Sequence, residues 1–265
     1  MNKTAALIYG LSFGLFLITA FSCNDNLNGP GGGQSGRRDY EWTIDTINTT
    51  SQTIRRLHGC SPDDIWATAS GGNLSSNLIH YDGSTWTTGE YSLPGSPFSI
   101  WSFSKDNVYL AIMSNESGIW QFNGSLWIED TTFAINGENR IVFDNMWGEN
   151  PNSIFAFGGY PDSNGYVNNS IIAHHSDSKW TMLNTDGIHG IVENLFRDQN
   201  NNKIYIQTIT SSGKYVDSTY IYEYSEGKYT ELFGNIWTKG IKGDISLIDG
   251  SVFFILGNTI ARLKN

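Results

Sequence analysis

Hydrophobic and polar positions follow one short pattern that this chain repeats five times. Each copy alternates hydrophobic and polar residues, breaks at a polar turn, and resumes on hydrophobic residues that end in an aromatic side chain. Alternation of this kind predicts two half-buried β-strands joined by a tight turn. The five copies are Leu57–Trp66, Ile100–Tyr109, Met146–Phe155, Leu195–Tyr205 and Ile245–Phe253.

The spacing of the copies predicts the architecture. Their closing aromatic residues recur every 43 to 50 residues, from Trp66 to Phe253. A period of roughly 40–50 residues, with a few short strands in each unit, is typical of the blades of a β-propeller. We therefore predict an all-β fold in which residues 39–265 form one ring of repeats.

A second hydrophobic stretch completes each of the first four units. It is broken by turns such as Asp82-Gly83, whose residues tolerate the positive φ that a hairpin needs. Each unit is thus predicted to be an antiparallel, four-stranded blade with strands A to D in chain order. The second stretches are Leu78–Trp86, Ile119–Trp127, Ile171–Trp180 and Ile221–Tyr229.

The fifth unit lacks a candidate for strand D. Its three predicted strands are Lys242–Leu247, Ser251–Leu256 and Thr259–Leu263. Residues 39–46 precede the first unit and resemble the D strands of the other units. We expect this N-terminal segment to pair with Thr259–Leu263 and to complete the fifth blade, which removes exposed strand edges. The prediction is a closed, five-bladed β-propeller.

The repeat resembles that of a bacterial family of secreted and lipid-anchored β-propellers. Units of that family read roughly S-P-D-D-[IV]-W-A and then Y-x-[DN]-G-x-x-W-T, and Ser61–Ala67 and Tyr81–Thr87 match both parts. The fourth unit departs from the pattern at 200–203, and the fifth keeps little beyond alternation. The resemblance runs from about Asp39 onward. It implies a propeller outside the inner membrane and leaves the activity open, because most members have no assigned activity.

The first 38 residues are expected to export and tether the propeller. Lys3 and the apolar run Ala5–Phe21 predict a signal peptide over 1–22, since the run is short for a membrane span. The stretch before and including Cys23 resembles a lipobox, which implies lipidation of that cysteine; the alternative is an ordinary signal peptide. Residues 23–38 are rich in Gly and Asn and predict a flexible tether. We expect a lipid-anchored protein at the outer membrane or cell surface of a bacterium.

Charge and motif content narrow the classes of partner. The net charge of −10 disfavours nucleic acid, because few cations are present to neutralise phosphates. With Cys23 lipidated, Cys60 has no cysteine to pair with. The adjacent His174 and His175 point to opposite faces of a strand and do not chelate one ion together. No motif for a cofactor, a metal or a nucleophile stands out, and we expect a monomer without cofactor or metal.

The start of strand A provides the first set of candidate binding residues. Strand A lies nearest the central channel, so its first polar positions are expected to ring the channel mouth. A ring with one cation, one carboxylate and three neutral hydrogen-bonding groups suits a sugar or a small polar ligand, or a file of ordered waters. The ring consists of Arg56, Ser99, Asn145, Asn194 and Asp244.

The loops between strands B and C provide the second set. They open on the same face as the ring, and they differ from one another, either because they bind a partner or because nothing constrains them. Their tyrosines Tyr160, Tyr166 and Tyr215 are candidates for a binding surface. The predicted loops are Ser70–Asn77, Met113–Gly118, Gly158–Ser170 and Thr210–Thr219.

Catalysis is a weaker alternative. Glycoside hydrolysis generally needs two convergent carboxylates, and the candidates near the starts of the A strands are Asp144, Glu193 and Asp244. No glycosidase motif surrounds them. The sequence therefore favours a non-enzymatic, lipid-anchored binding module for a glycan or an envelope protein. A carbohydrate-active hydrolase that uses the channel carboxylates and a purely structural envelope module remain the alternatives.

Overall fold

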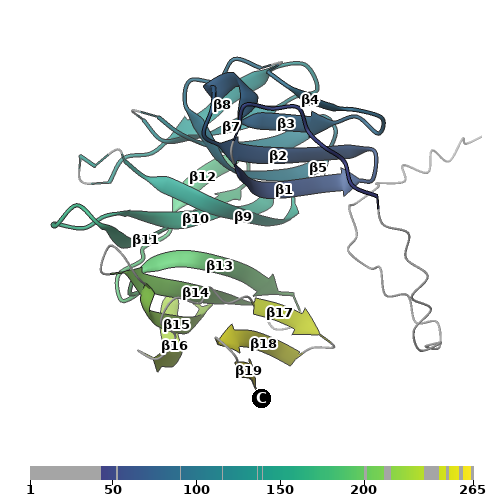
Figure 1. Ribbon diagram of the computed structural model, residues 1–265. Coiled ribbons are helices and arrows are strands. Elements are labelled where there is room, and N and C mark those ends of the chain that lie inside the picture. The colour runs from purple at the N-terminus through teal and green to yellow at the C-terminus, as the bar shows by residue number, and fades with distance from the viewer. Residues whose placement is uncertain are drawn as a thin grey trace, which may run out of the picture.

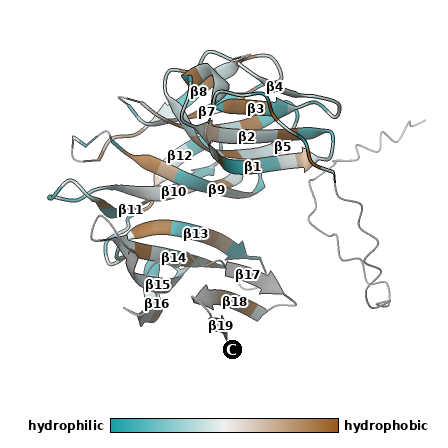
Figure 2. Ribbon diagram, in the orientation of Figure 1, coloured by the Kyte–Doolittle hydropathy of each residue, from teal (hydrophilic) through white to brown (hydrophobic). Residues whose placement is uncertain are grey.

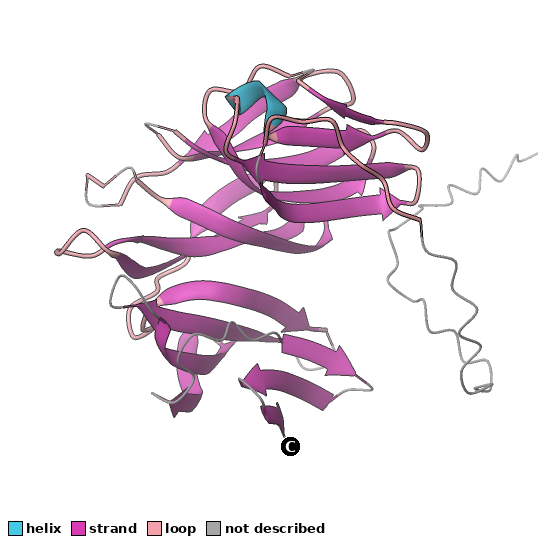
Figure 3. Ribbon diagram, viewed as in Figure 1, coloured by secondary structure: helices cyan, strands magenta, loops and turns pink. Residues whose placement is uncertain are grey.

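Antiparallel sheets make up nearly all of the regular structure in the described residues. The computed structural model describes residues 43–51, 53–89, 91–114, 116–135, 137–138, 140–199, 202–211, 216–235, 245–248, 251–256 and 259–263. A single short 3-10 helix, η1 (Leu74–Ser76), interrupts the strands within these ranges (Figure 3). No helix of this part of the chain is long and apolar enough to cross a membrane.

The first two sheets each have four strands in chain order, and each strand pairs antiparallel with the one before it. The first sheet consists of β1 (Thr53–Ser61), β2 (Asp64–Ser70), β3 (Leu78–Tyr81) and β4 (Trp86–Thr88). The second sheet consists of β5 (Ser96–Ser104), β6 (Asn107–Met113), β7 (Gly118–Phe122) and β8 (Trp127–Thr132). The predicted succession of strands A to D is confirmed in both.

The third and fourth sheets repeat this arrangement, and the described part of the fifth has three strands. The third sheet consists of β9 (Val142–Asn150), β10 (Ser153–Pro161), β11 (Val167–Ser176) and β12 (Lys179–Met182). The fourth consists of β13 (Ile191–Asp198), β14 (Lys203–Ser211), β15 (Val216–Ser225) and β16 (Lys228–Asn235). The fifth consists of β17 (Ile245–Ile248), β18 (Ser251–Leu256) and β19 (Thr259–Arg262).

The sheets follow one another in chain order, from purple to yellow in Figure 1. Their first strands lie together on the inside: β1 contacts β5, β5 contacts β9, β9 contacts β13, and β13 contacts β17. Strand A of each unit is therefore the inner strand, as predicted. In the described residues, no comparably extensive contact joins the fifth sheet to the first.

The core consists of clusters of buried hydrophobic residues between consecutive sheets. The hydrophobic stretches of the strands are coloured brown in Figure 2. Strand alternation turns one side chain of each inner strand toward the preceding sheet. Ile100, Met146 and Leu195 occupy this position and are all buried. Leu57 has the same position in β1 but is 59% exposed. Among the described residues, Leu57 thus lacks the preceding sheet that covers this position in the other inner strands.

The N-terminal segment lies against the face of the first sheet that carries Leu57, and it forms no strand in its described part. Residues 43–51 have no ladder pairing, and 39–42 lie outside the described residues. Asp45 Oδ2 accepts a hydrogen bond from Trp86 Nε1 at 3.1 Å, and Ile47 packs against Ala67 and Ile79. The predicted pairing of residues 39–46 with Thr259–Leu263 is therefore not seen at residues 43–46.

Two predicted B–C loops are shorter than expected. β10 continues to Pro161 and β11 begins at Val167, so Gly158 and Tyr160 belong to a strand. A Cβ on Gly158 would overlap the carbonyl oxygen of Val142 in β9. Gly158 begins the predicted loop, but in the structure it is a strand residue, and it must be glycine because the backbone of β9 comes close. In the fourth sheet β14 extends to Ser211 and β15 starts at Val216.

Candidate functional site

Each of the first four inner strands carries a β-bulge near its start. In β1, β5 and β13 the register shifts across one residue, and in β9 it shifts opposite Gly158 of β10. A bulge leaves a residue out of the ladder and redirects its side chain. The four bulges hold the residues directly before the predicted polar ring, namely Arg55, Phe98, Asp144 and Glu193.

Three of these bulge residues line one cavity of about 310 Å³, which we call the mouth cavity. It lies among the inner strands of the first three sheets, and Ser70 contributes from the end of β2, where the first B–C loop starts. The cavity is therefore at the predicted channel mouth, on the face of the long loops. Its lining is Thr53, Arg55, Arg56, Ser70, Phe98 and Asp144.

Two adjacent arginines dominate the charge of the mouth cavity. Arg56 Nε donates to the carbonyl oxygen of Asp144 at 3.0 Å, and its Nη1 donates to the carbonyl oxygen of Arg55 at 3.2 Å. The guanidinium of Arg55 lies over the ring of Phe98, with Cζ 4.2 Å from the ring centroid. A cation over an aromatic face is held in place electrostatically. Residues of three different sheets thus orient the two cations.

The other described residues of the predicted polar ring form hydrogen bonds with a neighbouring strand or within their own strand. Ser99 is fully buried, and its Oγ donates to the carbonyl oxygen of Phe143 at 2.9 Å, which links β5 to β9. Asn145 Oδ1 accepts from the backbone N–H of Met146, and Asn194 Nδ2 donates to Gln207 Oε1 at 3.1 Å. Asp244 lies outside the described residues. Of the described ring residues, Arg56 alone lines the cavity.

The two described candidate catalytic carboxylates, Asp144 and Glu193, do not meet in the mouth cavity. Asp144 lines it, whereas Glu193 is buried at the bulge of β13 and does not line it. Asp244 lies outside the described residues. Within the described ranges, no three His, Cys, Asp or Glu side chains gather closely enough to hold a metal ion.

The two described loop tyrosines, Tyr160 and Tyr166, do not form one surface. Tyr160 is half-buried in β10 and packs against the core between the second and third sheets. Tyr166 lies at the tip of the connection to β11 and is 52% exposed. Tyr215 lies outside the described residues. The described tyrosines therefore provide one exposed ring, which stands away from the packed core.

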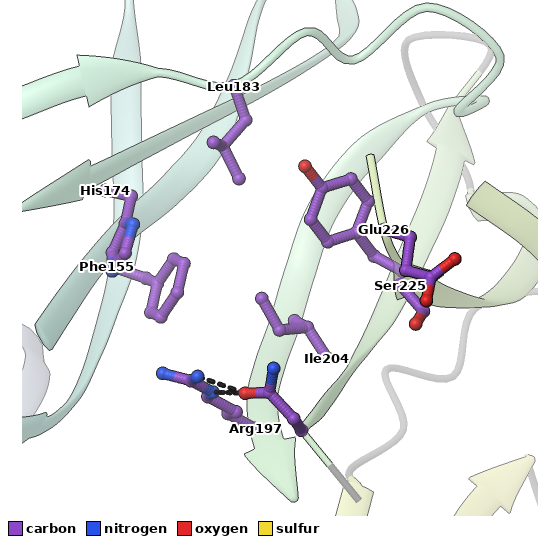
Figure 4. A pocket seen from close by; sticks show the side chains of 9 residues that line it. Phe155, His174, Leu183, Arg197, Ile204, Ser225 and Glu226 are labelled. Carbon is purple, nitrogen blue, oxygen red and sulfur yellow. Dashed lines mark hydrogen bonds between the residues drawn. The ribbon is translucent and has the colours of Figure 1, made fainter. Parts of the chain in front are cut away.

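A second cavity, of about 220 Å³, lies between the third and fourth sheets near their short turns (Figure 4). His174 stacks on Phe155 at 4.1 Å between ring centroids, and Leu183 and Ile204 face these rings. Burial, with Arg197 and His175 nearby, lowers the pKa of His174. His175 points to the other face, where Nδ1 lies 3.0 Å from the carbonyl oxygen of Pro151, so the two histidines diverge as predicted.

The first unit shows how the equivalent space is filled elsewhere. Trp66 and His80 occupy the places of Phe155 and His174, and His80 Nε2 lies 2.7 Å from Asp64 Oδ1. The smaller Phe155 leaves the second cavity hollow. Since Phe155 is only 1% exposed, a ligand has little access to this aromatic floor. The mouth cavity is the better candidate because its charged groups are accessible.

Sequence reasoning found Arg56 and Asp144 but missed Arg55 and Phe98. Strict alternation would place Arg55 on the same blade face as Leu57, whereas the bulge takes it out of the β1–β2 ladder and Arg55 lines the mouth cavity. A signal was nevertheless present in the sequence. The column reads Arg, Phe, Asp and Glu in four otherwise similar units, and such dissimilar residues do not fill one packing role.

Comparisons with solved structures show a propeller-like fold, and they do not assign the chain to a family. No family model and no curated protein matches the chain. A structure described as YCF48 bound to D1 peptide is 16% identical, with a TM-score of 0.54 over 84% of this chain and 69% of that chain. The extracellular domain of BT4673 from B. thetaiotaomicron is 11% identical, with a TM-score of 0.57 over 85% of this chain and 29% of that chain. The lectin SapL1 in complex with alpha methyl fucoside is 15% identical, with a TM-score of 0.50 over 78% of this chain and 74% of that chain. At these identities the likeness concerns the fold alone.

Proposed function

We propose that the protein is a non-enzymatic binding module whose partner docks at the mouth cavity. One observation carries this proposal: bulges at the same place in three inner strands direct Arg55, Phe98 and Asp144 into one cavity. Bulges re-aim side chains next to functional sites, and loops and strand ends on a rigid scaffold are where binding residues concentrate. The partner is a glycan or an envelope protein.

The structural neighbours support a binding role. Two of them are described in complexes, one with a peptide and one with a methyl fucoside, and the third is an extracellular domain. A hydrolase is less well supported, because the described lining of the mouth cavity contains one carboxylate, Asp144, and glycoside hydrolysis generally uses two. A structural module does not need cations directed into a cavity.

The N-terminal sequence supports a location at the cell envelope. The predicted signal peptide over 1–22, the lipobox-like Cys23 and the Gly-rich tether over 23–38 lie outside the described residues. We propose that lipid on Cys23 anchors the domain to the outer membrane or cell surface. The 16 residues of the tether then hold the propeller away from the lipid while leaving it free to turn.

The function is tested with the mature chain, residues 23–265, expressed without its lipid, on glycan and peptide arrays with product release read in parallel. We expect binding without products, and a loss of at least fivefold in affinity for Asp144→Asn. Asp186→Asn is the matched control, because it removes the same charge from an exposed residue. Asp186 lies in the loop between β12 and β13 and does not line the mouth cavity. Product release that Asp144→Asn abolishes while binding persists would establish the hydrolase. If neither array shows binding or product release, the result would contradict the proposed binding function and favour the structural module.

We further propose that the five sheets close into a ring, with residues 39–46 as the outer strand of the fifth blade. The outer strands support this through a repeated contact: Trp180 Nε1 donates to Asp130 Oδ2 of the preceding blade at 2.7 Å. Asp130 follows Trp127 by three residues, as Asp45 follows Trp42. Asp45 receives the same bond from Trp86. Asp45 therefore has the partner that an outer strand preceding the first blade would have.

Closure has a measurable consequence at Leu57. In a closed ring this side chain packs against the fifth sheet, whose Ile260 is likewise exposed, so Leu57→Ala is expected to lower the free energy of unfolding by about 2 kcal/mol. Ile128→Ala is the control, since Ile128 lies on an outer strand and is half exposed. Urea denaturation measures both. Equal, negligible losses for the two variants would mean that the ring is open.

A further inference from the structure

The mouth cavity is lined by two positively charged side chains although the chain as a whole is acidic. The sequence carries 26 acidic and 16 basic residues, yet two successive basic residues, Arg55 and Arg56, line the same cavity. Neither forms an ion pair with a carboxylate of the described residues. Their contacts there are two backbone carbonyls and one aromatic ring. Among the described residues, the two cations are therefore oriented but not neutralised by an ion pair.

The geometry of Arg56 leaves donors available. A guanidinium has five N–H groups in a fixed plane, and the two hydrogen bonds to the carbonyl oxygens of Asp144 and Arg55 engage one on Nε and one on Nη1. The other N–H groups have no partner among the described residues. A guanidinium fixed in this way suits a planar carboxylate, because two parallel N–H···O bonds form with little further loss of side-chain freedom.

Arg55 is positioned from the other side of the cavity. Its bulge lifts it out of the β1–β2 ladder, and the ring of Phe98 on β5 supports its guanidinium at 4.2 Å. Since Arg55 precedes Arg56 directly and both line the cavity, one anion between them meets two positive charges. Exposed single charges attract weakly in water, so two guanidiniums that line one cavity are the stronger arrangement for an anion.

The remaining lining favours a sugar as the bearer of this anion. Thr53 and Ser70 contribute hydroxyls and Asp144 a carboxylate, which can accept hydrogen bonds from sugar hydroxyls. Phe98 is the one aromatic or aliphatic side chain of the lining, and Arg55 lies over its ring. A peptide end would bring an apolar side chain that finds little apolar surface there. A volume of about 310 Å³ is at the small end for ligand sites.

We propose that the mouth cavity binds an acidic sugar, a uronic acid residue of a glycan, through its carboxylate on Arg55 and Arg56. The inference rests on the proposed function and names the ligand class for the same cavity. Asp144 would then accept hydrogen bonds from the sugar hydroxyls, and Ser70 and Thr53 would donate to them or accept from them. The two arginines provide the selection for acidic over neutral sugars.

The test uses the mature chain with trigalacturonate, its fully methyl-esterified form and a peptide with a free carboxyl terminus, by isothermal titration calorimetry. We expect trigalacturonate to bind, and Arg55→Gln or Arg56→Gln to weaken it at least tenfold. Methyl esterification removes the charge with the sugar ring intact, and we expect it to weaken binding equally. Arg140→Gln is the matched control, since Arg140 is exposed and paired with Glu138. Arg56→Lys keeps the charge without the planar fork, and we expect an intermediate loss.

The outcomes separate this inference from the proposed function. If neutral glycans bind in a manner that depends on Asp144 and not on the arginines, the function stands and the acidic sugar is wrong. If the free-carboxyl peptide binds through the arginines and trigalacturonate does not, the carboxylate belongs to a peptide and the proposal is overturned. If no glycan or peptide binds in a manner that depends on Asp144 or on either arginine, both proposals are wrong. Circular dichroism of each variant confirms that a lost interaction is not a lost fold.

Discussion

Replacing Trp66 with alanine is expected to lower the free energy of unfolding by about 3–5 kcal/mol. Trp66 is fully buried between the first and second sheets. Its ring stacks on His80 at 4.0 Å and meets Trp127 edge-on at 5.5 Å. Removing the indole leaves a cavity that strands on both sides hold open, and interior packing at near-crystalline density does not readily collapse around it.

Urea denaturation of Trp66→Ala measures this loss. Tyr166→Ala is the aromatic control: Tyr166 is half exposed, so we expect a change within 0.5 kcal/mol. A similar, small effect for both variants would contradict a core formed between the first two sheets. A large effect for Trp66 alone shows that contacts between sheets hold the sheets together.

Replacing Gly158 with alanine is expected to lower the free energy of unfolding by up to about 3 kcal/mol and to impair binding at the mouth cavity. The added methyl group would overlap the carbonyl oxygen of Val142 and come within 2.8 Å of the backbone nitrogen of Asp144. Both are backbone atoms, so β9 itself must move. Since the carbonyl of Asp144 holds Arg56, a shift of β9 displaces a cation and a carboxylate of the cavity together.

Gly165→Ala separates this effect from ordinary backbone strain. Gly165 has φ of +83° and open space around its Cβ position, so alanine there costs about 1–2 kcal/mol through its conformation alone. We expect it to leave binding unchanged. Denaturation and trigalacturonate titration of both variants give the comparison. Full binding by Gly158→Ala would mean that the bulge of β9 does not position the cavity.

The strands were predictable because their signals are local. At the first C–D turn Asp82 Oδ1 accepts from the backbone N–H groups of Ser84 and Thr85, and these bonds lower the pKa of Asp82 to about 2. Gly83 supplies the positive φ, +91°. Four consecutive residues carry this turn, so sequence alone identifies it, and with it the pairing of the flanking strands.

The site was less predictable because it depends on pairing between strands. Arg55 leaves the ladder only because of the register between β1 and β2, which no single segment specifies. Gly158 looked like a loop residue, since its role comes from the approach of β9. Local patterns thus predicted the order of the strands but not the contents of the mouth cavity.

The bulges also separate two demands that compete in most β-proteins. A ladder residue is constrained by its cross-strand neighbour and by the next sheet. Arg55, Phe98 and Asp144 instead stand outside the ladder, and pairing resumes within two residues on each side of them. Exchanging one of them alters what the mouth presents without unpairing a strand. At such positions, related propellers or designed variants can change ligand specificity by substitution while retaining the same scaffold.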